Sequence, residues 1–537
     1  MWQNRPEMAR STIAVLVFFA VLLAVGAAVF RDYGISWDES FQRKYGQQVY
    51  AYVTEGNPRM LGGPMKYYGP AFELGLFGFE RALRLSDTRS IYFMRHFLTF
   101  LTFWLGTVFF YKLCRYMFGS WKIGLVGALL LVLSPRMLAE SFYNPKDMPF
   151  MAIFAISMYT LVRYIDAKTI RWAVAHAIAC GILVDIRIVG LLVPVFTIGF
   201  VAFGLVRAHG DAGVVRKYVL SLSAFAVLSA GLIVLLWPTL WHRPVYHLVQ
   251  AFKEMSHYPM GNPILYRGHY VRPQDIPWHY APVWIAITTP LVQIAGFLLG
   301  CLVALMRLVG RFKGGDAEGL RPEGSVASVI STRNLTVLLL WFFVPVLYVI
   351  LSRAALFDGW RHMYFVYPGF VGIAVVGFAG AFRTLKAGLK PRAARIVTAV
   401  VVAVVVLGLA NVVRTMARYH PYEHLYFNAL TGGTHSANGK YDLDYWGLSY
   451  RQGLEYILKS DKAPVVAVCV HTRPGTVNAE ILPARDRQRL RFVKDAYEAK
   501  YYLTDLRWDT ADYTPEEIAH VISVDRAKIM MVVRVTP

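Results

Sequence analysis

Charged residues are scarce in this sequence, and acidic residues are the scarcer kind. Only 17% of the 537 residues are charged while 56% are hydrophobic, and 56 lysines and arginines face 34 aspartates and glutamates. This balance is unlike that of a soluble globular chain and indicates a polytopic membrane protein. The net charge of +22 would suggest nucleic acid in a soluble chain, but the basic residues cluster in short loops between apolar runs. We therefore expect membrane lipids, and no nucleic acid, as partners.

The sequence also lacks the usual patterns of disulfide and metal sites. Its cysteines are few and scattered, three of them in or beside predicted membrane helices: Cys114, Cys180, Cys301 and Cys469. Neither a disulfide framework nor a CxxC metal site is predicted from them. There is no HExxH zinc pattern, no Gly-rich phosphate loop in the C-terminal tail and no internal repeat.

Long apolar runs dominate what is present. Runs long enough to cross a bilayer fall near 11–30, 91–111, 122–139, 148–165, 218–238, 283–306, 334–352, 363–382 and 394–413. The stretch 172–206 is too long for one helix, and Asp185 and Arg187 lie in its middle. We split it there into two helices that meet at a polar elbow, which gives about eleven spans. The first run is long for a signal-peptide core and is interpreted as a retained helix.

The loops between these runs set an orientation. With the N-terminus in the cytoplasm, all five even-numbered connections carry more lysine and arginine than acid, as the positive-inside rule requires. Residues 31–90 and everything after about 414 are then on the outer face. We predict a multi-pass protein with a membrane catalytic domain at 1–413.

The tail at 414–537 changes character and predicts a small α/β domain on the outer face. Charged stretches that we interpret as helices, "SYRQGLEYILKSD" and "TPEEIAHVI", alternate with strand-like runs, "PVVAVCV", "AKYYLTD" and "KIMMVVRVT".

Three acids are expected at one outer rim. Asp38 and Glu39 follow the first span in "YGISWDESFQ", and Asp147 precedes a later span in "FYNPKDMPFM". Each has an ordinary alternative, a solvated helix end for the pair and a helix cap for Asp147. Because adjacent residues point in different directions, one carboxylate of the pair could face a substrate while the other orients the loop. A carboxylate at this site could act as a general base.

Cationic residues are expected on the same face. They are Lys146, Arg187, His242, Arg243, Arg361 and His362. The planar guanidinium of an arginine matches the geometry of phosphate oxygens. The alternative roles for these cations are anchoring at the aromatic belt and snorkelling to the membrane surface. Acids and cations at the lipid–water boundary suit transfer of a sugar from a polyprenyl phosphate to an acceptor hydroxyl.

Four motifs in order carry a family resemblance. "ISWDES", "SFYNPKDMPFM", "GILVDIRIVGLLVP" and "GWRHMYFVYPGF" together resemble the bacterial integral-membrane GT-C glycosyltransferases, close to the protein O-mannosyltransferases (glycosyltransferase family 39-like) and the lipid A aminoarabinose transferases. The resemblance covers about residues 10–410. It implies a GT-C fold in a bacterial cytoplasmic membrane and a polyprenyl-phosphate-linked sugar donor.

The resemblance also implies roles for single residues. Asp38 matches the catalytic base, Glu39 a supporting acid and Asp147 an acid near the acceptor or a metal. Arg187 and Arg361 match positions expected to hold the donor phosphate, with His362 assisting. No cofactor is required with certainty; if Mg²⁺ or Mn²⁺ is used, Asp38, Glu39 and Asp147 are the expected ligands.

The tail has a second resemblance. "HPYEHLYFNALTGG" and "YDLDYWGLSYRQGLEYI" are similar to a stretch of uncharacterised bacterial members of the superfamily, and differ from the MIR domains of eukaryotic protein mannosyltransferases. The acceptor, whether glycan, lipid or protein, therefore stays open. Asp442, Asp444 and Trp446 line an acceptor cleft in one interpretation and have a structural role in the other.

The sequence thus predicts an inverting glycosyltransferase. One base, one departing phosphate and no protected nucleophile favour a single displacement. The alternative is a transporter or flippase of lipid-linked sugars, which would place ionisable groups and broken helices near the bilayer midplane, often in repeated halves. Only one interrupted segment is found, at 181–190, and the acids lie at helix ends instead.

Overall fold

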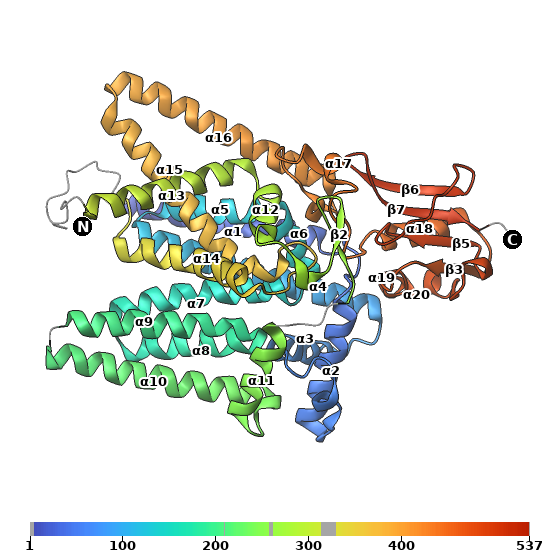
Figure 1. Ribbon diagram of the computed structural model, residues 1–537, viewed down its shortest axis with the longest axis horizontal. Helices are drawn as coiled ribbons and strands as arrows, with labels where there is room; N and C mark the ends of the chain where they lie inside the picture. Colours follow the sequence, from blue (N-terminus) through green and yellow to red (C-terminus); the bar gives the residue numbers. More distant parts are fainter. Residues whose placement is uncertain (1–4, 209, 257–260, 313–328, 536–537) are drawn as a thin grey trace.

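Long helices run side by side along the protein, with a small sheet at one end (Figure 1). The computed structural model describes residues 5–208, 210–256, 261–312 and 329–535. Within these ranges nine helices are long and apolar enough to cross a membrane, and a bent helix pair raises the number to ten. The protein is therefore a multi-pass helical membrane protein, as predicted.

The spans follow the predicted runs closely. They are α1 (Arg5–Val29), α4 (Thr88–Phe118), α7 (Asp147–Ala167), η2 with α9 (Ile188–Leu191 and Leu192–Arg207), α10 (Ala212–Leu236), α13 (Leu291–Phe312), α14 (Thr332–Ser352), η6 with α15 (Arg361–Val366 and Tyr367–Gly388) and α16 (Pro391–Tyr419). The eleventh predicted span corresponds to α8 (Ile170–Ile186), which runs beside α7 and α10 (Figure 1). It has 17 residues, about 25 Å of helix, less than a typical hydrocarbon core.

Two predicted spans are broken where a proline begins a new helix. The run at 122–139 divides into α5 (Trp121–Val132) and α6 (Pro135–Tyr143), which meet at an angle of 69°. The run at 283–306 divides into α12 (Tyr280–Thr288) and α13, with Pro290 between them. Proline has no N–H to continue a helix and its ring fits the first turn of the next one. Each of these two predicted runs therefore consists of two helices.

The predicted polar elbow is confirmed. Helix α8 ends at Ile186, and Arg187 is extended, with φ −149° and ψ 133°. The Asp185 carboxylate accepts a hydrogen bond of 2.6 Å from the N–H of Ala71. A Cβ atom on Gly69 would lie 1.1 Å from the carbonyl oxygen of Asp185, so only glycine fits there. The loop after the first span thus packs directly against the elbow.

Shorter elements lie at the sheet end of the bundle (Figure 1). They are α2 (Glu39–Glu55), η1 (Pro58–Gly62), α3 (Ala71–Ala82), η3 (Pro238–Leu240), α11 (Pro244–Ser256), β1 (Ile264–Tyr266), β2 (His269–Val271) and η4 (Pro273–Asp275). Strands β1 and β2 form an antiparallel hairpin. Asp38 lies directly before α2, and His242 and Arg243 lie between η3 and α11.

The C-terminal part forms a five-stranded mixed sheet with short helices. Its elements are η7 (Glu423–Leu425), α17 (Gly433–Ala437), α18 (Tyr450–Ser460), β3 (Val466–Val470), α19 (Pro474–Val477), η8 (Asn478–Ile481), α20 (Ala484–Arg487), β4 (Leu490–Phe492), η9 (Ala496–Glu498), β5 (Tyr501–Thr504), β6 (Ile518–Val524) and β7 (Ala527–Arg534). The strand order is β4-β3-β5-β7-β6. Helix α18 and strands β3, β5 and β7 match the predicted elements.

The prediction of a helix at "TPEEIAHVI" was wrong. Residues Ile518–Val524 form β6, which pairs antiparallel with β7. The turn between them places Asp525 and Arg526 at φ 49° and 64°, a left-handed pair that suits a tight hairpin. Pairing with the apolar strand β7 decides the structure here, because intrinsic strand preference depends strongly on the neighbouring strand.

The C-terminal part packs firmly against the loop after the first span. The backbone N–H of Trp37 donates to the carbonyl of Trp446 at 3.0 Å. The side chain of buried Asn478 accepts from the N–H of Ile35 and donates to its carbonyl, both at 2.9 Å. Helix α16 runs past the predicted boundary at 413/414, to Tyr419. The segment that carries Asp38 is therefore held by residues more than 400 positions away in sequence.

Candidate functional site

The adjacent acids Asp38 and Glu39 have different surroundings. Asp38 precedes α2, and its side chain remains 20% exposed, with Oδ2 3.0 Å from Nη1 of Arg361. The Glu39 carboxylate is buried, accepts a hydrogen bond of 2.8 Å from the N–H of Ser36, and lies 3.1 Å from Nε2 of His96. Glu39 therefore fixes the loop, while Asp38 stays partly exposed beside Arg361.

Asp147 begins α7 but does not cap it. Asn144 does so instead, since its Oδ1 accepts from the N–H of Asp147 at 2.9 Å. The Asp147 carboxylate is ion-paired with Arg187, lies 3.2 Å from Nη1 of Arg361, and receives a hydrogen bond of 3.0 Å from Asn144 Nδ2. Two guanidinium groups thus contact this buried carboxylate. Asp147 is therefore suited to hold the two arginines in place.

Arg361 is the centre of the cluster. Its buried guanidinium contacts three carboxylates, at 3.0 Å (Asp38), 3.2 Å (Asp147) and 3.2 Å (Asp358), and lies 4.8 Å from the ring centroid of Trp446. A buried charge of this kind is stable only when it is paired on several sides. Arg361 therefore helps to hold both Asp38 and Asp147 in position.

The cluster continues into the C-terminal part through Arg507, which the sequence did not single out, to Asp442, which it did. Asp358 is ion-paired with buried Arg507, whose Nε lies 3.9 Å from Oδ1 of Asp442. Burial raises the pKa of Asp442 to about 6, against the opposing effect of Arg507. The spacing of Asp358 and Arg361, three residues apart, was a signal for their pairing. Arg507 has no local motif, so nothing in the sequence pointed to it.

A cavity of about 170 Å³ opens beside the cluster and has two chemically different parts. Lys146, Arg187 and His362 contribute cationic or proton-binding groups to its lining. The remaining walls are largely apolar and come from η2, α9, α11 and α14 and the segment before Arg361, including Ile188, Leu192, Phe252, Met255, Pro345, Val349 and Phe357. Such a lining fits a ligand with an anionic head and an apolar tail.

Lys146, which lines the cavity, has an unusual environment for a lysine. Its ammonium lies 3.6 Å from the ring centroid of Tyr68, a cation–π contact. Burial and the nearby charge of Arg187 lower the pKa of Lys146 to about 7, although Asp38 and Asp147 act in the opposite direction. The charge of this residue therefore changes near neutral pH.

The comparison with protein families fits this geometry. Residues 59–246 match the family described as Dolichyl-phosphate-mannose-protein mannosyltransferase. The match confirms the resemblance to the GT-C glycosyltransferases. The mannosyltransferase-like segment contains Lys146, Asp147 and Arg187, while Asp38 and Arg361 lie outside it. No curated protein matches the chain.

Two solved structures are similar to the chain at low identity. ArnT from Cupriavidus metallidurans, bound to undecaprenyl phosphate, has a TM-score of 0.48 and 14% identity, covering 97% of this chain and 98% of that one. The Archaeoglobus fulgidus oligosaccharyltransferase in its apo form has a TM-score of 0.43 and 11% identity, covering 90% of this chain and 65% of that one.

Two predicted cations of the mannosyltransferase-like segment lie apart from the cluster. His242 and Arg243 follow η3 and are exposed, and neither is among the described residues that line the cavity. Helix α11, which follows them, instead contributes Phe252 and Met255 to the apolar wall. In the described chain the structure therefore gathers Asp38, Asp147, Arg187 and Arg361, with Lys146 and His362 beside them, and leaves the "WHR" turn outside.

The three predicted metal ligands do not come together. Across the described residues, no group of three or more His, Cys, Asp or Glu side chains is placed to hold a metal ion. Asp38 and Asp147 face Arg361, and Glu39 faces His96. Because arginines and a histidine occupy the carboxylate oxygens that a hard cation would need, this set does not fit a shared Mg²⁺ or Mn²⁺.

Proposed function

We propose that the protein is an inverting glycosyltransferase that moves a sugar from a polyprenyl-phosphate donor to an acceptor hydroxyl. We place this reaction at the outer face of a bacterial cytoplasmic membrane, with the N-terminus in the cytoplasm. The observation that carries the proposal is the cavity with cationic groups and apolar walls beside the partly exposed Asp38. The acceptor is a glycan, a lipid or a protein that offers a hydroxyl group.

The donor occupies the cavity in two parts. Its phosphate lies at Lys146, Arg187 and His362, and its first isoprene units lie against the apolar walls. Arg187 is well suited to this role, because its pairing with Asp147 fixes one side of the guanidinium and leaves further donors of the fork for phosphate oxygens.

Transfer then takes place in one displacement. The acceptor hydroxyl oxygen attacks the anomeric carbon, its proton passes to the Asp38 carboxylate, and the bond from the anomeric carbon to the phosphate oxygen breaks. Polyprenyl phosphate leaves with the bonding electrons, and the cationic groups stabilise its added charge. Attack opposite the leaving group inverts the anomeric centre. Asp147 holds Arg187 and Arg361, and Arg361 holds Asp38.

The position of the charges favours an enzyme over a flippase. Asp147 begins α7, Arg361 begins η6 and Arg187 follows the end of α8, so the cluster lies at helix ends. A transporter would be expected to place such groups near the middle of its spans.

A lipid analysis of cells tests the function. Cells that lack the protein are expected to accumulate a polyprenyl-phosphate sugar that cells with the wild-type protein consume, and its mass identifies the sugar. Unchanged donor pools together with altered sidedness of a lipid-linked sugar would instead establish the transporter.

The titration of Lys146 predicts a pH dependence of donor use. Lys146 is charged below its pKa of about 7 and neutral above it. We expect kcat/KM for the donor to fall about tenfold as pH rises through this value, because one charge-assisted hydrogen bond to phosphate is lost. The check is a pH profile of wild type and Lys146→Arg. The arginine variant keeps its charge and should lack this decline; the same decline in both would assign it to another group.

A further inference from the structure

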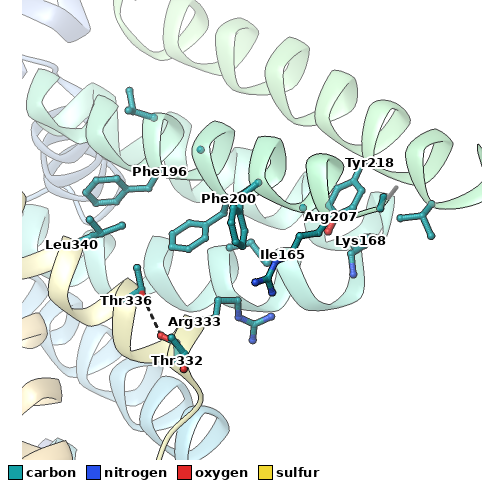
Figure 2. Close-up of a pocket in the computed structure, with 16 residues that line it drawn as sticks. Ile165, Lys168, Phe196, Phe200, Arg207, Tyr218, Thr332, Arg333, Thr336 and Leu340 are labelled. Atoms are coloured by element: carbon teal, nitrogen blue, oxygen red, sulfur yellow. Dashed lines mark hydrogen bonds between the residues drawn. The ribbon is translucent and has the colours of Figure 1, made fainter. Parts of the chain in front are cut away.

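Two further cavities lie at different distances from Asp38. The larger, of about 1120 Å³, is lined mainly by α7, α9, α10 and α14, and Figure 2 shows Phe196 and Leu340 in its lining. Lys168, which follows α7, also lines it, whereas Asp147 begins that helix, so 21 helical residues separate this cavity from the candidate site, a distance of about 30 Å. It is too far away to bind an acceptor beside Asp38.

The smaller cavity, of about 300 Å³, lies where the C-terminal part meets the β1–β2 hairpin. Its lining comes from the hairpin, from the segment 438–445, from residues 505–507 and from the start of β7. Tyr266 of the hairpin pairs antiparallel with Tyr441, and the N–H of Gly268 donates to the carbonyl of Lys440 at 3.0 Å. Backbone contacts therefore hold its walls together, as in pre-formed ligand pockets.

This smaller cavity is close to the proposed base. Arg507 belongs to its lining, and a row of ion pairs leads from Arg507 to Asp38. The ring of Trp508, the next residue, lies 6.4 Å from the ring of Trp37, which precedes Asp38. The described lining shares no residue with that of the cavity assigned to the donor. A separate ligand can therefore bind beside the donor.

Asp444 and Trp446 fit the structural role that the sequence left as one of two interpretations. The Asp444 carboxylate accepts from the N–H groups of Leu448 at 3.2 Å and Ser449 at 2.8 Å, and lies 3.2 Å from Nε2 of His424. Trp446 is buried and is not among the described residues that line the smaller cavity.

Asp442 instead retains an oxygen for a ligand. Its Oδ2 accepts from the N–H of Leu265 at 3.0 Å, whereas its Oδ1 lies 3.9 Å from Nε of Arg507, too far for a hydrogen bond. That Nε is buried and has no hydrogen-bond partner in the part of the chain that the structure describes. An unmatched donor thus lies beside an unmatched acceptor oxygen. Hydroxyl groups suit such a pair, because each can donate and accept.

Aromatic rings and a further acid complete the lining. Tyr270 and Tyr441 both line the cavity, and Tyr270 is 53% exposed. Burial and the charge of nearby Asp442 raise the pKa of the Tyr270 phenol, against the effect of Arg507. Buried Asp505 adds another carboxylate. The cavity therefore offers both aromatic faces and charged hydrogen-bonding groups.

A lining of this composition fits a neutral sugar ring. An aromatic face packs against the C–H groups of a pyranose, and carboxylates accept from its hydroxyls. The described lining contains three aspartates and two basic residues, Arg507 and Lys528, so positive charge is not in excess there, as a phosphate would require. A volume of about 300 Å³ is at the small end of ligand pockets, which favours a ring over an acyl chain.

We propose that this cavity binds a neutral sugar residue of the acceptor, so that the acceptor is a glycan or a glycolipid and not a polypeptide. The inference rests on the proposed function. A sugar residue that does not react is bound here and holds a hydroxyl of the same acceptor near Asp38. Its binding free energy then serves to orient that hydroxyl for attack.

The direct test is binding of methyl glycosides to the full chain in phosphatidylcholine nanodiscs, without sugar-based detergent. The probes are the methyl glycosides of glucose, galactose, mannose and N-acetylglucosamine, and saturation-transfer NMR measures Kd. We expect at least one to bind, and Tyr270→Ala and Asp442→Asn each to weaken binding about tenfold, the scale of one aromatic contact or one charge-assisted hydrogen bond. Tyr497→Ala is the matched control, because Tyr497 is 77% exposed in the C-terminal part and outside the lining.

Three results would overturn the inference. They are binding of none of the glycosides, glycoside binding that is equally strong in Tyr270→Ala and Asp442→Asn, and binding of a short peptide rich in serine and threonine that Tyr270→Ala abolishes while no glycoside binds. The melting temperature of Tyr270→Ala should equal that of the wild type, because this side chain is half exposed. A loss of binding then reports on the cavity and not on folding.

The lipid analysis of cells separates this inference from the proposed function. Donor accumulation without the protein, together with no glycoside binding, would keep the transferase and remove the sugar site. Glycoside binding with unchanged donor pools would remove the transferase and with it the acceptor role of the cavity. Partition of the radiolabelled product distinguishes the two acceptor sources, since a glycolipid enters the organic phase and a free glycan the aqueous phase.

Discussion

Asp38→Asn is expected to lower the rate of sugar transfer by about 10²–10⁴-fold, the usual contribution of a general base. Asparagine keeps the size of the side chain and a carbonyl oxygen for Arg361, but it cannot accept the acceptor's proton. The measurement is the initial rate in membranes from complemented cells, using the donor that the lipid analysis identifies, together with the melting temperature of the purified variant. We expect that temperature to change little, because Asp38 is partly exposed and caps no helix.

Asp32→Asn is the matched control for this experiment. Asp32 lies on the same loop, is 51% exposed and pairs with His420 rather than with Arg361. It should retain most of the wild-type rate. If Asp38→Asn retains a comparable rate, Asp38 is not the base, and the single-displacement mechanism needs another proton acceptor.

Arg361→Gln is expected to destabilise the protein as well as inactivate it. The substitution leaves Asp38, Asp147 and Asp358 around a neutral side chain, and unpairing a buried ion pair costs about 3–5 kcal/mol. The melting temperature in detergent should therefore fall well below that of Asp38→Asn. Arg361→Lys keeps the charge but not the planar fork, so its loss should be intermediate.

A second substitution separates the electrostatic explanation from simple loss of packing. In the Arg361→Gln background, Asp358→Asn removes one of the stranded carboxylates and should recover part of the lost stability. Recovery in this double variant identifies the charge imbalance as the cause. A double variant no more stable than Arg361→Gln would show that packing against Trp446 and Phe357 dominates instead.

The sequence was most informative where structure depends on local pattern. Apolar runs located the spans, and the charges at 185 and 187 located the elbow, because both features follow from the cost of placing polar groups in a bilayer. That the runs across Pro135 and Pro290 each divide into two helices could not be read from hydropathy, since hydropathy alone does not register where a helix restarts. The helix predicted at 514–522 was wrong because the decisive contact is with β7, a partner that the local window does not contain.

Among the site residues too, some could be identified from local sequence and others could not. Acids and cations that stand next to helix ends, such as Asp147 and Arg361, could be found because topology alone brings them to one face. Arg507 could not, since its place in the cluster depends on a contact with Asp358, which lies 149 positions earlier in the chain. The same prediction put His242 and Arg243 on the same face as the cluster, but nothing in the sequence specifies which way that turn faces.

The row of ion pairs from Asp38 through Arg361, Asp358 and Arg507 to Asp442 has a consequence for synthesis of the protein. When the ribosome has synthesised every membrane helix, it has not yet reached Arg507. At that stage Asp358 still lacks one of its two ion-pair partners. Arg507 lies between β5 and β7 in sequence, and these two strands pair in the folded protein. The charge pattern around Asp38 is therefore completed only when the end of the chain has folded, and a half-made protein in the membrane does not yet have the finished site.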